Sequence, residues 1–88
     1  MKVDFRSSFL KDINRLKDRK VRRKIDQLLD QVKSCKSIEE VSNLKKLKGY
    51  QNFYRVRIGN YRIGIVVNND TLVFTRVLHR KEIYRYFP

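Results

Sequence analysis

The sequence predicts a small α+β domain in which an N-terminal strand and two helices pack on an antiparallel sheet. Two observations support this class: apolar residues recur at helical spacing in the first half, and the period changes to two after residue 44. Turn signals then divide the second half into a meander of three strands, followed by a short C-terminal helix. With 88 residues the chain is expected to form a single domain over residues 1–88.

The first half begins with a short strand followed by two amphipathic helices. Residues 2–5, KVDF, alternate in polarity as a strand does, and Ser7 or Ser8 is expected to cap the next helix. A second helix begins after Asp18 and keeps an apolar stripe for about three turns. The short connection predicts an antiparallel helical hairpin. The solvent side of the second helix is basic, through Arg19, Lys20, Arg22, Arg23 and Lys24.

The segment between the helices and the sheet contains the only cysteine. Ser37 and Glu40 have the spacing of a capping box, which predicts a short helical turn within residues 38–43. Cys35 has no partner for a disulfide, and we interpret it as a small buried side chain. This cysteine usage suits a reducing compartment, so we expect the protein in the cytoplasm.

The Gly59-Asn60 turn predicts the register of the central hairpin. A two-residue turn there creates one apolar face directed at the helices, with the pairs Ile58 and Tyr61, Val56 and Ile63, and Tyr54 and Ile65. The opposite face places Arg57 directly across from Arg62. Arg55 then lies across from Gly64, where the absent side chain is expected to leave open space.

The third strand of the meander, within residues 71–80, is apolar on both faces, so its pattern does not assign Arg76 to either face. Its end is better defined. His79, Arg80 and Lys81 stand where the strand gives way to the C-terminal helix, KEIYRYFP.

Charge is the strongest functional signal. Lys and Arg total 22 against 9 Asp and Glu, a net charge of +13 that favours an anionic partner such as RNA. No acidic residue lies between Glu40 and Asp70, and the cations of that interval are Lys45, Lys46, Lys48, Arg55, Arg57 and Arg62. Like charges on one sheet face destabilise strand pairing. The three arginines of the hairpin face therefore favour a bound state in which phosphates neutralise them. For the basic helix, solvated surface and phosphate contact are equal alternatives.

Few catalytic chemistries fit this composition. His79 is the only histidine and the nine carboxylates are scattered, so neither a metal site nor a cofactor is expected, and no nucleophilic triad is evident. No apolar run approaches the roughly 20 residues of a membrane span, and the N-terminus has no secretory signal, so no membrane partner is expected.

Metal-free RNA cleavage, in which the ribose 2'-OH attacks its own phosphate, remains compatible with the sequence. Arginines suit the stabilisation of the phosphate charge but are poor bases. Tyr84 and His79 flank Arg80, and either can stack on a base or move a proton. The alternatives are core packing for Tyr84 and a structural role for His79.

The stretch LKGYQNFYRVRIGNYRIGIVV, followed by RVLHRKEIYRYF, resembles the RelE/ParE superfamily of toxin-antitoxin toxins over nearly the whole chain. The basic sheet face and the closing His-Arg-x-x-x-Tyr favour the RelE branch. The resemblance implies a RelE-like fold and a ribosome-dependent endoribonuclease that inhibits translation by cleaving mRNA without a metal ion. It also implies a cognate antitoxin, expected to be acidic, that wraps the toxin and can displace the terminal helix.

The resemblance also implies roles for individual residues. The basic strand positions of the family fall on Arg55, Arg57 and Arg62, the arginine after the last strand on Arg80, and the terminal aromatic on Tyr84. Arg57, Arg62 and Arg80 are expected to stabilise the scissile phosphate, Arg55 to position the backbone and Tyr84 to stack on or orient the substrate. Further RNA-binding residues are expected at Lys45, Lys46, Lys48, His79 and Lys81.

Some family members have lysines at the first two positions, where a lysine can act as the base; here both are arginine. The base is therefore unassigned, with Lys48, His79 and Tyr84 as candidates. Three other functions fit the sequence. One is a ParE-type inhibitor of DNA gyrase, the second is a non-catalytic RNA- or ribosome-binding module, and the third is an inactive toxin.

Overall fold

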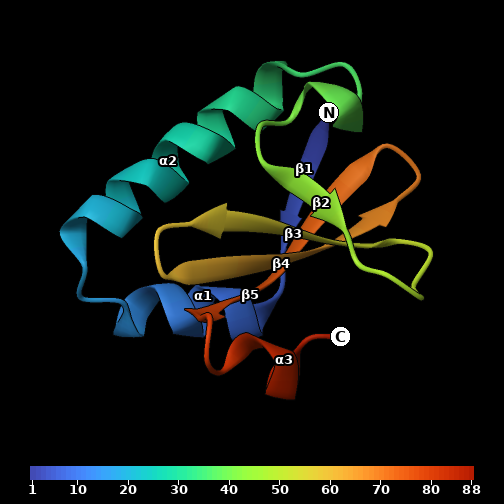
Figure 1. Ribbon diagram of the computed structural model, residues 1–88. Coiled ribbons are helices and arrows are strands. Elements are labelled where there is room, and N and C mark those ends of the chain that lie inside the picture. The colour runs from blue at the N-terminus through green and yellow to red at the C-terminus, as the bar shows by residue number, and fades with distance from the viewer.

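One five-stranded sheet organises the chain, and the computed structural model describes all 88 residues (Figure 1). The elements are β1 (Lys2–Phe5), α1 (Ser7–Arg15), α2 (Arg19–Ser34), the 3-10 turn η1 (Ile38–Glu40), β2 (Leu44–Lys46), β3 (Phe53–Ile58), β4 (Tyr61–Asn68), β5 (Thr71–His79) and α3 (Ile83–Tyr86). The strand order is β1-β5-β4-β3-β2, with β1 parallel to β5 and the other neighbours antiparallel. The predicted α+β class is confirmed.

The sheet has one strand that the sequence did not predict. Strand β2 is only three residues long and pairs with Tyr54–Val56 of β3. Two of its three residues are exposed lysines, so it has no alternation long enough to be recognised. It is a strand because the edge of β3 provides backbone partners.

The beginnings of the two long helices differ in how they are capped. The Asp18 carboxylate accepts hydrogen bonds from the backbone N–H groups of Lys20 and Val21, both at 3.1 Å, which confirms the predicted start of α2. The prediction that Ser7 or Ser8 caps α1 is wrong. The N-cap is Arg6, without a side-chain bond, and the Ser8 hydroxyl donates instead to the Thr75 carbonyl at 2.7 Å.

The two helices follow each other through a short connection and both pack on the sheet, as predicted, but they diverge at an angle (Figure 1). Helix α1 packs mainly on β5, whereas α2 packs on β1 and β3. The sheet is the main packing partner of each helix. The reason is that both apolar stripes meet the large apolar face of the sheet, which buries more surface than a contact between two narrow stripes.

The core lies between these helices and the sheet. Fifteen buried residues form one cluster, among them Phe9, Ile25, Ile63, Ile65 and Phe74. Three further buried apolar residues, Val73, Ile83 and Phe87, lie outside it. They belong to the opposite side of the sheet, where α3 contacts β4 and β5.

The register predicted for the central hairpin is confirmed. Ile58 lies opposite Tyr61 and Arg57 opposite Arg62, around the turn at Gly59, whose φ is +56°. The expected open space at Gly64 is wrong. A Cβ added to Gly64 would lie 2.5 Å from the nearest ring carbon of Phe87, so the C-terminal segment fills that space. Gly64 is needed because Phe87 packs directly on the backbone of β4.

The connection before β2 is close to the prediction. The short turn is η1, and the Glu40 carboxylate accepts from the Ser37 N–H at 3.0 Å, as a capping box requires. It ends earlier than residue 43, because the backbone is already extended at Val41, and Asn43 then takes a positive φ of 61° before β2. Cys35 is buried and free, as predicted. No helix has the length and apolar character of a membrane span.

Candidate functional site

Four arginines gather at one end of the sheet, and we call Arg55, Arg57, Arg62 and Arg80 the arginine cluster. Arg55 and Arg57 lie on β3, and Arg62 on β4 is the cross-strand partner of Arg57. Arg80 follows β5, and its backbone N–H donates to the Asn60 carbonyl at 2.7 Å. The hairpin turn thus holds the end of β5 beside the first two arginine-bearing strands.

The electrostatics of Arg62 show how close these groups are. Partial burial is the largest cause that lowers the pKa of the Arg62 guanidinium, followed by the charges of Arg57 and Arg55 and, more weakly, of Arg80. The influence of Tyr84 acts in the opposite direction and raises this pKa. The structure therefore brings Arg62 into the field of the rest of the cluster and of the Tyr84 side chain.

No carboxylate of the chain neutralises the arginine cluster. The Arg62 guanidinium donates to the backbone carbonyls of Gly59 and Tyr61, both at 2.9 Å. The only side-chain ion pair in the structure lies elsewhere, between Arg76 and Asp12. The cluster is a cationic surface whose charges are available to an anion.

Tyr84 stands on α3 with 61% of its surface exposed, so the alternative of core packing is wrong. Its helix is held by the residues on either side of it. Ile83 is 1% and Phe87 2% exposed, and the Phe87 ring stacks on Phe53 with centroids 5.4 Å apart. These contacts leave the Tyr84 ring free to contact a ligand beside Arg62.

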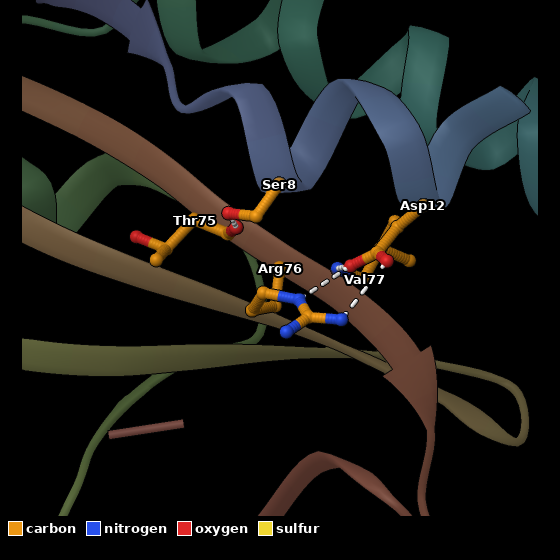
Figure 2. A network of polar contacts seen from close by, with 5 residues as sticks. All are labelled: Ser8, Asp12, Thr75, Arg76 and Val77. Carbon is orange, nitrogen blue, oxygen red and sulfur yellow. Dashed lines mark hydrogen bonds and ion pairs between the residues drawn. The ribbon is translucent and has the colours of Figure 1, made fainter. Parts of the chain in front are cut away.

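Arg76, which the sequence did not assign to a face, is neutralised by its own chain (Figure 2). Its Nε and one terminal nitrogen donate to the Asp12 carboxylate at 2.8 and 3.1 Å, and the same carboxylate accepts from the Val77 N–H at 3.0 Å. The hydrogen bond to Asp12 is the largest cause that raises the pKa of Arg76. The ring of Tyr86 covers the guanidinium at 4.9 Å.

Figure 2 also shows why Asp12 lies there. Strand β1 ends at Phe5, opposite Phe74, so beyond that point β5 has no neighbouring strand on this side, although β4 still pairs with its other edge. Ser8 and Asp12 of α1 replace the missing strand by bonding the Thr75 carbonyl and the Val77 N–H. Arg76 is therefore part of the attachment of α1 to the sheet and not of the arginine cluster.

His79 does not lie with the arginine cluster. It is the partner of Tyr61 on the core side of the hairpin, and the two rings meet edge to face at 5.7 Å. Its Nδ1 accepts from the Lys81 backbone N–H at 3.2 Å. His79 lines a hollow together with Arg15 and Glu82, whereas Arg62 projects from the other face of β4.

The predicted RNA-binding lysines lie in three separate places. Lys45 lies opposite Arg55, and both line a shallow hollow with Arg57 and Asn43. Lys46 and Lys48 line a different hollow, in the connection from β2 to β3. Lys81 is exposed in the turn before α3. Asn43 also lines the hollow beside Lys45; no sequence motif marks it, and its positive φ is evident only in the structure.

No group of three or more His, Cys, Asp or Glu side chains lies close enough to hold a metal ion. The chemistry that the arginine cluster and Tyr84 can perform is recognition of a phosphate with several donors and contact of a planar base with an exposed ring.

Comparison with known proteins gives consistent matches over the whole chain. A family model described as the ParE toxin of type II toxin-antitoxin system, parDE, matches residues 3–84. Toxin RelE3 of Methanocaldococcus jannaschii is 47% identical over 89 residues, which cover 100% of both chains. Putative toxin RelE1 of the same organism is 32% identical over 81 residues, or 91% of this chain and 89% of that protein.

A solved structure shares the fold. The RelB-RelE antitoxin-toxin complex from Methanococcus jannaschii contains a chain that is 45% identical to this one, with a TM-score of 0.83. The match covers 97% of this chain and 99% of that chain.

Proposed function

The chain belongs to the RelE/ParE family of toxins of type II toxin-antitoxin systems, and on this premise we propose that it is a ribosome-dependent endoribonuclease that cleaves mRNA and inhibits translation. The observation that carries the proposal is the arginine cluster, in which four cations converge without a carboxylate of their own chain. Repulsion between these cations destabilises the free protein, whereas a bound phosphodiester neutralises them and accepts their hydrogen bonds.

In the proposed reaction the ribose 2'-oxygen attacks the adjacent phosphorus, and the bond from phosphorus to the 5'-oxygen breaks. The proton of the 2'-OH passes to a base, and the leaving 5'-oxygen receives a proton. The products are a 2',3'-cyclic phosphate and a 5'-hydroxyl. Arg57, Arg62 and Arg80 stabilise the negative charge that develops on the phosphate oxygens, and Arg55 positions the backbone of the RNA.

For the proton transfers and the orientation of the base, the positions of the candidates favour Tyr84. It is exposed and lies close enough to Arg62 to influence the pKa of that group, whereas His79 lies on the other face of the hairpin and Lys48 lines a separate hollow. We assign Tyr84 to stacking on the substrate or to proton transfer. Lys45 extends the basic surface along β2, beside Arg55.

The partner we propose is a cognate antitoxin. The similar toxin from Methanococcus jannaschii was solved in a complex of RelB and RelE, and the fold of its toxin chain is close to this one. We expect the antitoxin of this toxin to be acidic, because the protein it covers has a net charge of +13.

The test is cleavage of a translated message, mapped by primer extension, with the purified toxin added to a translation system. Discrete cuts within codons are expected, and the isolated products should end in a cyclic phosphate even when a chelator is present. Arg80→Ala should abolish the cuts while leaving the unfolding transition in place. RNA that is bound but never cut would indicate a non-catalytic module or an inactive toxin, and full cutting by Arg80→Ala would remove that residue from the site.

The family model that matches residues 3–84 is described as a ParE toxin, which supports one second candidate, an inhibitor of DNA gyrase. A gyrase supercoiling assay with the same preparation separates the two. Inhibited supercoiling with intact mRNA would replace the nuclease proposal.

A further inference from the structure

A groove runs between α2 and the end of β3, next to the arginine cluster. We call it the α2–β3 groove. It is lined by Lys24, Gln27, Leu28, Gln31, Ser42, Asn43, Val56, Arg57, Ile58 and Gly59. Figure 1 shows the N-terminal half of α2 on the same side of the molecule as the turn between β3 and β4. Two of the lining residues, Asn43 and Arg57, also line the hollow that contains Lys45 and Arg55. The groove is thus continuous with the surface of the arginine cluster.

The residues that α2 contributes to the groove carry one positive charge and no negative charge. Lys24, Gln27 and Gln31 follow i, i+3 and i+7 and line the groove. The acids of the helix, Asp26 and Asp30, do not line it. A merely solvated helix face has no reason to keep its acids away from one particular groove, whereas a groove that holds a polyanion does.

The position of the cations along α2 is also unfavourable for the free helix. Five of the first six residues are basic, and none forms an ion pair. The N-terminus of a helix carries a partial positive charge, so cations in the first turns destabilise it. An anion bound in the groove would offset the share of that cost that belongs to Lys24, which lines it.

Most of the residues that line the groove are of polar type, and part of its wall is held in place by a hydrogen bond. The side-chain amide of Gln31 donates to the Ser42 hydroxyl at 2.7 Å, which joins α2 to the segment before β2. The apolar residues that contribute to the lining, Leu28, Val56 and Ile58, are each 7% exposed or less. The groove therefore offers few apolar anchors of the kind on which protein partners depend.

We propose that the α2–β3 groove holds the sugar–phosphate backbone of the RNA strand that is bound at the arginine cluster, where that strand continues beyond Arg57. This inference rests on the proposed function, because it takes the ligand of the cluster to be RNA. Lys24 contacts a phosphate, and the amides of Gln27 and Asn43 bond the sugar or phosphate oxygens. Specificity for a base sequence is not required for such contacts.

The experiment measures binding of the isolated toxin to RNA oligonucleotides that carry 2'-O-methyl groups and so resist cleavage. A trinucleotide and a nonanucleotide of uniform sequence are compared by fluorescence anisotropy. The wild type should bind the nonanucleotide more tightly. Lys24→Glu should weaken binding of the nonanucleotide about tenfold and leave the trinucleotide unchanged. In Lys24→Gln the magnitude of the salt slope should fall by about 0.7, the value for one lost phosphate contact on a single strand.

Arg23→Glu is the matched control, because it makes the same change of charge at the neighbouring position, which does not line the groove. Equal effects of Lys24→Glu and Arg23→Glu would show that net charge alone acts and would overturn the proposal. So would a wild type that binds both oligonucleotides equally. If Lys24→Glu weakens only the complex with the antitoxin, the groove belongs to the protein partner and the proposal fails.

These outcomes are separable from those of the proposed function. If the toxin cuts mRNA but Lys24→Glu has no effect on binding, the nuclease proposal is supported and the proposal of an RNA site in the groove is overturned. If binding depends on the length of the oligonucleotide but no mRNA is cut, the groove proposal is supported and the nuclease proposal is overturned. A thermal unfolding curve for each variant confirms that the protein tested is folded.

Discussion

Arg62 and Arg76 project from the same face of the sheet, on neighbouring strands, yet their surroundings are opposite. Arg76 forms two hydrogen bonds to the Asp12 carboxylate, which raise its pKa. Arg62 bonds only backbone carbonyls, and burial together with neighbouring cations lowers its pKa. The charge of Arg76 is therefore neutralised within the fold itself, while that of Arg62 is neutralised only when an anion binds.

Helix α3 connects these two regions. Tyr86 covers Arg76, whereas Tyr84 lies within the field of Arg62. The paired arginine contacts this helix only through the Tyr86 ring, because the buried Ile83 and Phe87 hold the helix on the sheet. Four predictions test this division, and they are ordered from the largest expected effect to the smallest.

Asp12→Ala should lower the free energy of unfolding by about 3–5 kcal/mol, because it leaves the Arg76 guanidinium and the Val77 N–H without their acceptor. Urea denaturation measures the change. Asp4→Ala is the control, since the exposed Asp4 carboxylate accepts only from the Phe5 N–H, and it should cost about 0.5 kcal/mol or less. Equal costs for the two variants would mean that the ion pair is not what holds α1 on the sheet.

Arg62→Gln should reduce the cleavage rate by about a hundredfold, the effect of removing one donor that stabilises a transition state. Single-turnover cleavage of a translated message measures it. Arg76→Gln removes the same group from the same face and should keep the rate per folded molecule near that of the wild type. If both variants lose activity equally while folded, the distinction between the two arginines is wrong.

Gly64→Ala should lower the free energy of unfolding by about 1–3 kcal/mol, because the new methyl group would lie 2.5–2.7 Å from the ring carbons of Phe87. Chemical denaturation of Gly64→Ala alone and in a Phe87→Ala background measures the coupling. In that background the cost of the added methyl group should largely disappear. A cost that stays the same would show that Gly64 serves the strand and not the docking of α3.

Arg57→Gln should raise the free energy of unfolding by about 0.5 kcal/mol at low salt and without RNA, because Arg57 faces Arg62 directly across the hairpin. Added salt should reduce the gain, since it screens the repulsion. Lys2→Gln is the control, because Lys2 lies opposite Thr71 and has no cation across the strand pair. A stability loss in Arg57→Gln would show that the cluster is held together by contacts that outweigh its repulsion.

Features that depend on near neighbours in the chain were predictable. The start of α2 at Asp18, the turn at Gly59 and the opposition of Arg57 and Arg62 follow from residues within a few positions of one another. Helix capping and hairpin register depend on residues close together in the chain, so the sequence pattern predicts them. The same reasoning placed the hairpin arginines of the cluster on one face, whereas Arg80 was assigned through the resemblance to the family.

Features that depend on distant residues were not predictable. The partner of Arg76 is 64 positions away, and the occupant of the space at Gly64 is in the C-terminal segment. Serine is a residue type that often caps helices, but the Ser8 hydroxyl donates to the Thr75 carbonyl, because β1 does not extend far enough to pair with β5 there. His79 adjoins Arg80 in sequence, yet it lies on the other side of the hairpin, since successive residues of a strand point to opposite faces.

The sequence alone determined the charge of this protein, the order of its main elements and the pairing of its central hairpin, because periodicity and turn chemistry act over a few residues. Only the tertiary structure decided which cations are neutralised and which remain free. That choice depends on which of the few carboxylates comes within hydrogen-bond distance of which arginine, and the packing of α1 and α3 on the sheet sets those distances.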